Sequence, residues 1–253
     1  MSDVEVQPAA EAAAGLTQWQ RVTNTFTAPS KTFEDIKRGN RSWWLPLIIT
    51  ALAGYLLFAV VSQKIGMQTV VDNQIRISPK AQERMTQQTP EQREAGNKIA
   101  LGISEGIFLG GPLIGLVGVA VLSAVMLGTI NFVFGGRAKY GSVFAVYYYA
   151  YLPSLVKVLL GIVVIFAGIA PESFNVKNFA PTNLGAFLDP IDTNKALYAL
   201  ATSVDAVTIW FLVLLSIGLA TVAGVKRSAG YIAVFGWWAI VVLVGAGAAL
   251  VFG

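Results

Sequence analysis

The sequence predicts an all-α membrane protein, a polytopic bundle of about five transmembrane helices. Hydrophobic residues make up 55% of the 253 residues and charged residues only 13%, whereas soluble domains average about 25% charged. The charges are also grouped, which leaves long uncharged stretches at 42–63, 106–136, 206–225 and 228–253. A bilayer core about 30 Å thick needs roughly 20 apolar residues of helix, and each stretch is long enough. Soluble helices rarely stay uncharged over that distance, because one face normally meets water.

The composition also limits the chemistry that the chain can perform. It contains no cysteine and no histidine, which excludes disulfides and thiolate sites and removes the commonest general base and metal ligand. The sequence shows no metal-ligand spacing, no phosphate-binding Gly-Lys-Ser/Thr loop and no paired carboxylates within the apolar stretches. The net charge of +4 is modest, and basic residues are mixed with acidic ones, so we expect no nucleic-acid partner. The sequence therefore favours a protein that is not an enzyme and needs no cofactor or metal.

The chain is predicted to begin with a polar region outside the bundle. Residues 1–15 are rich in Ala, Glu and Pro, a composition typical of a disordered tail. Residues 16–42 are predicted to form a cytoplasmic amphipathic helical segment, because apolar side chains recur there at helical spacing, namely Leu16, Trp19, Val22 and Phe26. Two positions for this first helix remain open. It lies either on the membrane surface, with Trp19 among the headgroups, or on the cytoplasmic end of the bundle.

A second short helix is predicted directly after Pro29, which ends the first. Ser30 is a suitable N-cap, and Lys37 and Arg38 at the other end suit the negative pole of the helix dipole. Gly39 follows at the position where helices commonly end in a left-handed residue.

Residues 43–252 are predicted to form the membrane domain. Its spans are expected at about 43–62, 107–134, 142–169, 206–224 and 231–251. Extramembrane loops are expected at 63–105 and 170–203. In the first loop, Ser78-Pro79 and Thr89-Pro90 each start a helix outside the membrane. The second of these has Gln92 in the position of a capping box and can run on into the second span.

The distribution of basic residues predicts the orientation. The turn after the second span contains Arg137 and Lys139, the turn after the fourth contains Lys226 and Arg227, and neither contains an acid. Both turns fall on the same side as the amino terminus, whereas the loop 63–105 mixes six basic with five acidic residues. Basic residues are enriched in cytoplasmic loops, so we expect the amino terminus inside the cell and the carboxyl terminus outside.

Lys157 is the most informative single residue, because it interrupts the third span. It lies about 21 Å along the helix from Val143, in the outer half of the membrane. Charges at such depth usually face the bundle or a cavity. Asp205 and Glu105 stand at the outer ends of the fourth and second spans, so we predict that Lys157 pairs with one of them, more as a structural pair than as a transport site. The alternative is that its long stem carries the charge outward to the interface.

Small residues recur where helices could touch, at Gly111 and Gly115 in the second span and at Ser216, Ala220 and Gly224 in the fourth. Such rows allow close backbone approach in lipid, and we expect packing within the monomer, with homodimerisation as the weaker alternative.

Prolines and tyrosines mark the second and third spans. Pro112 and Pro153 are expected to kink them. Tyrosines cluster early in the third span, where consecutive residues cannot share one face, so an aromatic belt is expected, with some rings at the headgroups and others in the bundle.

Four stretches of the sequence form a recognisable set. They are Trp19-Gln20-Arg21 with Phe26 to Phe33 and Trp43-Trp44-Leu45-Pro46; Gly135 to Tyr140 with Ala150-Tyr151-Leu152-Pro153; Asp205 to Trp210 running to Gly218; and Ala223 to Arg227 with Trp237-Trp238. Together they resemble the bacterial branch of the Yip (Ypt/Rab GTPase-interacting protein) family of multi-pass membrane proteins, and the resemblance covers about residues 17–252.

The resemblance implies a Yip-like membrane domain of five spans with a cytoplasmic amino terminus. Eukaryotic relatives bind prenylated Rab-type GTPases and act in vesicle traffic and membrane shaping. This chain has Trp44-Leu-Pro46 in place of their Tyr-Gly-Pro element, so a GTPase is not an expected partner.

The sequence is compatible with two functions. The first is a non-enzymatic scaffold or organiser in the cell inner membrane that interacts with lipids, with other membrane proteins or with itself. The second is a small transporter or channel with Lys157 near a polar site.

Overall fold

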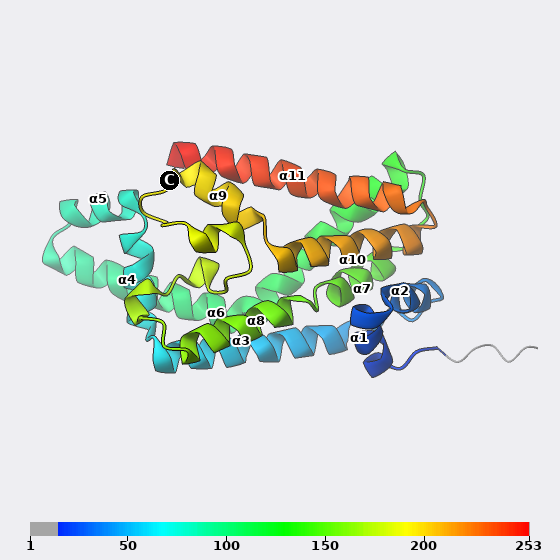
Figure 1. Ribbon diagram of the computed structural model, residues 1–253, viewed down its shortest axis with the longest axis horizontal. Coiled ribbons are helices and arrows are strands. Elements are labelled where there is room, and N and C mark those ends of the chain that lie inside the picture. The colour runs from blue at the N-terminus through cyan, green and yellow to red at the C-terminus, as the bar shows by residue number, and fades with distance from the viewer. Residues whose placement is uncertain (1–14, 253) are drawn as a thin grey trace, which may run out of the picture.

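The structure is a computed structural model that describes residues 15–252, so the predicted tail lies outside the described residues except for Gly15. Five helical segments are long and apolar enough to cross a membrane. They are α3 (Trp44–Lys64), α6 (Pro90–Gly128) with a π-helical turn (Thr129–Val133), α7 (Tyr140–Ala150) with α8 (Ser154–Phe166), α10 (Ala206–Ala223) and α11 (Arg227–Phe252). They run along the long axis of the molecule, and none of the described residues forms a β-strand (Figure 1). The predicted all-α bundle is confirmed.

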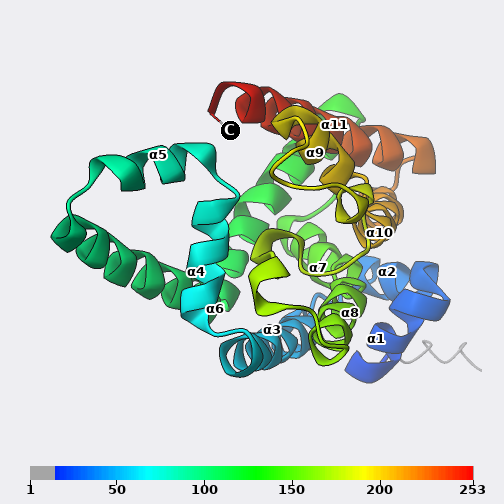
Figure 2. The ribbon, with the colours of Figure 1, turned by 60° about the vertical axis from the view of Figure 1, so that its left-hand side comes forward.

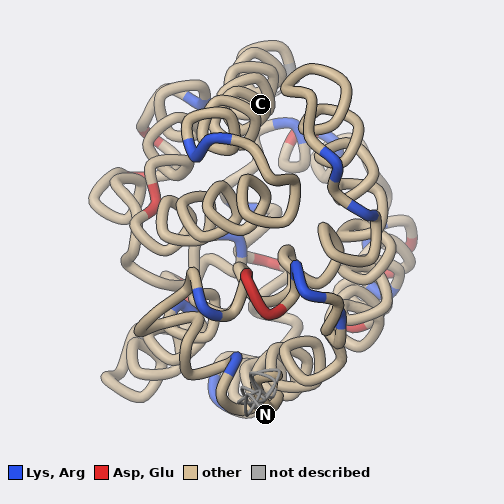
Figure 3. Tube along the Cα trace, turned by 90° about the vertical axis from the view of Figure 1, so that its right-hand side faces the viewer, with Lys and Arg blue, Asp and Glu red and all other residues tan. Residues whose placement is uncertain are grey.

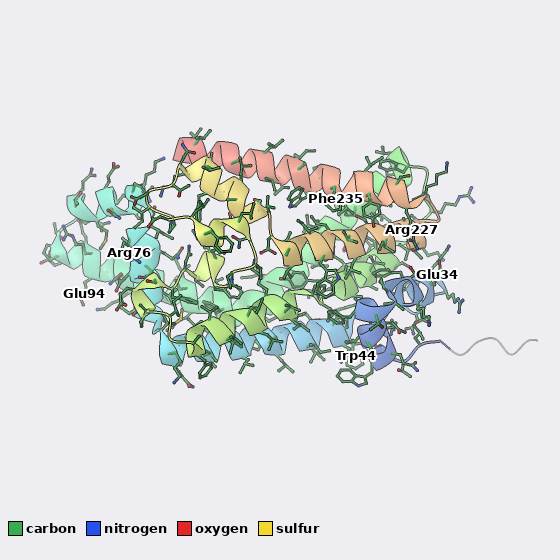
Figure 4. The ribbon with its side chains drawn as sticks, viewed as in Figure 1. Glu34, Trp44, Arg76, Glu94, Arg227 and Phe235 are labelled. Carbon is green, nitrogen blue, oxygen red and sulfur yellow. The ribbon has the colours of Figure 1, made fainter. Side chains whose placement is uncertain are left out.

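The remaining elements lie at the two ends of this bundle. The N-terminal end carries α1 (Gln18–Thr27), α2 (Pro29–Lys37) and the turns 134–139 and 224–226. The opposite end, called the far end below, carries α4 (Met67–Arg76), α5 (Pro79–Gln87), three short 3₁₀ turns (Pro171–Ser173, Val176–Asn178 and Leu184–Phe187) and α9 (Lys195–Ser203). Figure 4 shows Trp44, Glu34 and Arg227 at the N-terminal end, and Arg76 and Glu94 at the far end.

The start of α2 differs from the prediction. The helix begins at Pro29 with Ala28 as N-cap, so Ser30 is inside it, and its hydroxyl accepts a hydrogen bond from Arg227 instead (3.3 Å). Proline at the first helical position needs no amide partner, which explains the earlier start. The helix ends at Lys37, and Gly39 adopts a positive φ of 123°.

Helix α6 is much longer than the span expected at 107–134. Thr89 and Gln92 form the predicted capping box at its start, and the helix continues for 39 residues without a break at Pro112. At 1.5 Å per residue it is about 58 Å long, roughly twice the thickness of a bilayer core. Its first part therefore extends beyond the hydrocarbon, and together with α5 it forms a projecting arm (Figure 2).

The third span is broken rather than kinked. Helix α7 ends at Ala150 and α8 begins at Ser154, and the turn between them is held by short-range bonds from Ser154 N to Tyr151 O (3.0 Å) and from Leu155 N to Leu152 O (3.0 Å). Pro153 offers no amide donor, and its ring clashes with the preceding turn of a regular helix. The tyrosine cluster divides as expected: Tyr148 and Tyr149 are buried, whereas Tyr140 and Tyr151 are exposed.

The segment 170–203 packs back against the bundle at the far end instead of hanging free. Phe174 and Ala180 are buried, and Asn73 of α4 donates hydrogen bonds to the carbonyls of Pro171 (2.8 Å) and Phe174 (2.9 Å). Helix α9 lies along α11, and α10 starts well inside the length of the bundle (Figure 1). Irregular backbone at membrane depth is tolerated only where protein covers it, which accounts for this packing.

Ser216 and Ala220, two of the predicted small residues, lie in a close contact between α10 and α11. A Cβ built on Gly230 would overlap the backbone oxygen of Ser216 and lie 3.1 Å from the Ala220 side chain. Gly224 instead ends α10 in the left-handed region (φ 71°) with open space around it. The packing prediction also fails for Gly111 and Gly115, where an added Cβ would meet nothing within 4 Å, because α6 stands away from its neighbours there.

Candidate functional site

Lys157 and Asp205 form an ion pair inside the bundle. Lys157 Nζ lies 3.1 Å from Asp205 Oδ2, and the side chains are 26% and 2% exposed. The same carboxylate oxygen accepts a bond from Thr182 Oγ1 (2.5 Å), and the other oxygen caps α10 by accepting from Thr208 N (2.7 Å). Glu105, the second carboxylate considered for this pair, is exposed on α6 and lies in no ion pair of the described residues.

The pair joins three parts of the chain. Lys157 comes from α8, Asp205 precedes α10, and Thr182 belongs to the segment 170–203, whose backbone is bridged to α10 by Ala206 N to Thr182 O (2.9 Å). The hydrogen bonds from Thr182 and Thr208 and the Lys157 charge all favour the ionised form of the Asp205 carboxyl, whereas burial opposes it. A charged carboxylate with a partner for each oxygen is typical of a structural ion pair, here one that connects three parts of the chain.

A second polar cluster, which the sequence did not reveal, lies at the N-terminal end around Arg21. The Arg21 side chain is 1% exposed, and its Nη1 donates to the carbonyls of Asn40 (2.9 Å) and Ser42 (3.2 Å). Its Nε lies 3.6 Å from Asp35 Oδ2, and the guanidinium stands 5.1 Å from the ring centre of Tyr149. The cluster thus ties α1, α2, the segment 40–42 and α7 together.

Asp35 and Tyr149 complete this network. Asp35 accepts from Leu16 N (3.0 Å) and from the amide of Asn40 (3.0 Å), and Tyr149 donates its hydroxyl to Gln18 (2.8 Å). The hydroxyls of Thr25 and Thr32 both donate to the carbonyl of Arg21, at 2.8 and 2.9 Å. Each buried charge therefore has partners on more than one element, which is the condition for burying it without a large penalty.

The network resolves the position of the first helix in an unexpected way. Helix α1 packs on the end of the bundle, as one of the two interpretations proposed, but through its polar face, with Arg21 and Thr25 buried. Trp19 stays 64% exposed and Phe26 36% exposed, although Phe26 also packs edge-on against Trp210. We call α1 and α2 the N-terminal platform; it is anchored by polar residues and leaves apolar side chains exposed.

A lateral cavity of about 770 Å³ opens between α3 and α6. Most of its wall is apolar, Gly111, Gly115 and Gly118 widen it, and Tyr148 and Tyr151 line it from the third span. A bond from Tyr55 to the carbonyl of Leu109 (3.0 Å) and stacked rings of Phe58 and Phe108 join the two helices beside it. An apolar wall suits hydrocarbon better than a hydrated solute, and Lys157 is not among the lining residues.

Fold and site together define a multi-pass helical membrane protein with a polar-anchored platform at one end. The family model of the Yip1 domain matches residues 23–249, which is most of the chain. The chain therefore belongs to the Yip family, as its sequence stretches indicated. No curated protein and no solved structure matches it.

Proposed function

We propose that the protein is a non-enzymatic organiser of the bacterial inner membrane, of the bacterial branch of the Yip family, that presents the N-terminal platform to a membrane-associated protein partner. The observation that carries the proposal is the Arg21–Asp35 network. It holds α1 in one position while Trp19 remains 64% exposed. A fixed helix with an exposed aromatic face is suited to binding a partner, because little ordering entropy is lost.

The charge distribution supports a cytoplasmic position for the platform. Along segments 16–43, 134–140 and 224–228 the sequence has nine basic and two acidic residues. The far-end segments 64–105 and 170–203 balance eight basic with eight acidic residues. Basic residues favour the cytoplasmic side, so the platform faces the cytoplasm.

A cysteine introduced at Lys31, which is exposed on α2, tests this orientation in a chain without native cysteine. We expect a membrane-impermeant thiol reagent to label it in inverted membrane vesicles and to leave it unlabelled in intact spheroplasts. Labelling in intact spheroplasts would reverse the proposed topology.

A transporter or channel is the alternative function, and the geometry favours it less. Transport through Lys157 needs a polar, water-accessible space beside it, whereas Lys157 lines neither described cavity and its carboxylate partner is fully hydrogen-bonded. Solute flux into proteoliposomes that disappears in Lys157→Ala would favour the transporter.

The partner is tested by replacing the exposed aromatic residues of the platform, Trp19→Ser with Phe26→Ser. We expect a saturable partner, captured from native membranes by cross-linking, to bind at least about tenfold more weakly, the loss of roughly one anchor residue. The protein's own thermal unfolding should change little through Trp19, which is largely exposed, and modestly through Phe26, which loses its edge-on contact with Trp210.

The matched control keeps the apolar surface, with Trp19→Phe and Phe26→Leu, and should retain the partner. Equal capture by the serine variant and the control would show that the platform is not the binding surface.

A further inference from the structure

A second cavity, of about 400 Å³, lies at the N-terminal end and has a different character from the lateral one. Its walls come from the end of α2 and the segment after it, the turn 135–139, the start of α7 and the end of α10. Four of the nine lining residues are cationic, and none is acidic: Lys37, Arg41, Gly135, Arg137, Lys139, Ser142, Val222, Ala223 and Gly224. We call it the basic pocket. Figure 3 looks onto this end and shows Lys and Arg positions on several of its segments.

The carboxylates of this end do not neutralise the pocket. Asp35 is buried against Arg21, and Glu34 points to the surface of α2 and is not a lining residue. Within the described residues, no ion pair includes any of the four lining cations. Like charges gathered around one space repel each other, and a bound anion would relieve that repulsion.

Two further features favour anion binding in the pocket. Arg41 is one of its lining residues, and the Arg41 Nε donor has no hydrogen-bond acceptor among the described residues. Helix α7 begins at Tyr140, beside Lys139 in the wall, and the positive dipole at the amino end of a helix favours an anion.

The turn that carries Arg137 and Lys139 is held in place. Asn131 accepts from Ala138 N (2.9 Å) and donates to its carbonyl (3.0 Å), Gly136 N donates to Ile130 O (3.0 Å), and Arg137 N donates to Ala223 O (3.0 Å). The cationic side chains are therefore presented from a fixed backbone, which lowers the ordering cost of binding.

We propose that the basic pocket binds a phosphate-bearing anion. Arginine and lysine together are the usual ligands of phosphate, and the cavity volume is within the range of small-ligand sites, about 300–1,000 Å³. Arg41 of the pocket wall stands two residues before Trp43, the N-cap of α3, and tryptophans at the start of a span are typical of the headgroup level. The phosphate belongs either to an anionic phospholipid or to a soluble molecule. The phospholipid as the source rests on the proposed function as a membrane organiser.

The test uses the full-length protein purified in a neutral detergent, with bound species counted by native mass spectrometry. One arm adds phosphatidylglycerol, a second adds phosphatidylcholine and a third adds inorganic phosphate. We expect phosphatidylglycerol to bind in preference to phosphatidylcholine. In Arg137→Gln with Lys139→Gln, the affinity should fall about ten- to hundredfold, the loss of one charge-assisted hydrogen bond or more. Both side chains are exposed, so the fold should tolerate the change.

The control also removes one lysine and one arginine from the N-terminal end, with Lys31→Gln and Arg38→Gln. Lys31 and Arg38 are exposed and do not line the pocket. It should bind within about twofold of the wild type, because such side chains lie outside the contact. If inorganic phosphate competes with the lipid, the ligand is a phosphate group from either source; if it does not, the ligand is the lipid headgroup. The proposal would be overturned by equal losses in both double variants, or if phosphatidylglycerol is not preferred over phosphatidylcholine and inorganic phosphate does not bind either. Neither result would affect the partner experiment on Trp19.

Discussion

Asp205→Ala is expected to destabilise the protein by about 3–5 kcal/mol, the usual cost of leaving a buried ionic partner uncompensated. The change removes the acceptor of Lys157 Nζ, the acceptor of Thr182 Oγ1 and the cap of α10 in one step. Lys157 would then hold its charge among apolar helices, since only 26% of its side chain is exposed. The measurement is reversible unfolding in mixed micelles, followed by the helical signal.

Removing the orphaned charge should restore part of this loss. Asp205→Ala combined with Lys157→Met is expected to be about 2 kcal/mol more stable than Asp205→Ala alone, because the two residues are directly coupled. Thr182→Val provides a milder reference and should cost about 1 kcal/mol, one hydrogen bond. A variant Asp205→Ala as stable as the wild type would show that the pair does not hold the bundle together.

Arg21→Met is expected to release α1 from the bundle, with a local loss of about 3–5 kcal/mol for the broken buried pair. Asp35 would keep its bonds from Leu16 N and Asn40 but lose the cation beside it. Helix α1 contacts the rest of the protein mainly through this network and α2, so the loss should appear as local opening. Amide hydrogen exchange of residues 18–27 should accelerate, while that of α10 should not.

The comparison for this variant is Arg38→Met, which removes an exposed arginine from the end of α2. Its effect should stay within about 0.5 kcal/mol, as for most surface changes. Unchanged exchange of α1 in Arg21→Met would mean that the network does not anchor the platform.

Hydropathy was enough to predict the five membrane helices, because neutral stretches of that length are rare elsewhere. It was not enough to place the start of α6. The residues from Glu91 to Glu105 include five charged residues but no proline, so the helix continues from Thr89 through the predicted loop into the span. Glu, Gln, Lys and Arg are good helix formers, so polarity alone does not end a helix.

The two charge clusters show which site residues a sequence can reveal. Lys157 stood out because it interrupts an apolar span, and a buried charge needs a partner. Arg21 and Asp35 did not stand out, since charges in a polar helix usually face water. Arg21 lies just before residues 23–249, which the family model matches, so that match did not point to it either. The small residues spaced four apart were ambiguous for a related reason. The spacing is the same in both spans, but Ser216 contacts a neighbouring helix, whereas Gly115 faces a cavity.

The uninterrupted length of α6 has a mechanical consequence. One continuous helix connects the projecting arm with Asn131, which is hydrogen-bonded to the turn beneath Arg137 and Lys139. An unbroken hydrogen-bonded helix resists stretching along its axis, so an axial displacement of the arm would also displace Asn131. A molecule that binds and displaces the arm on one side of the bilayer would therefore also displace Arg137 and Lys139 on the other side.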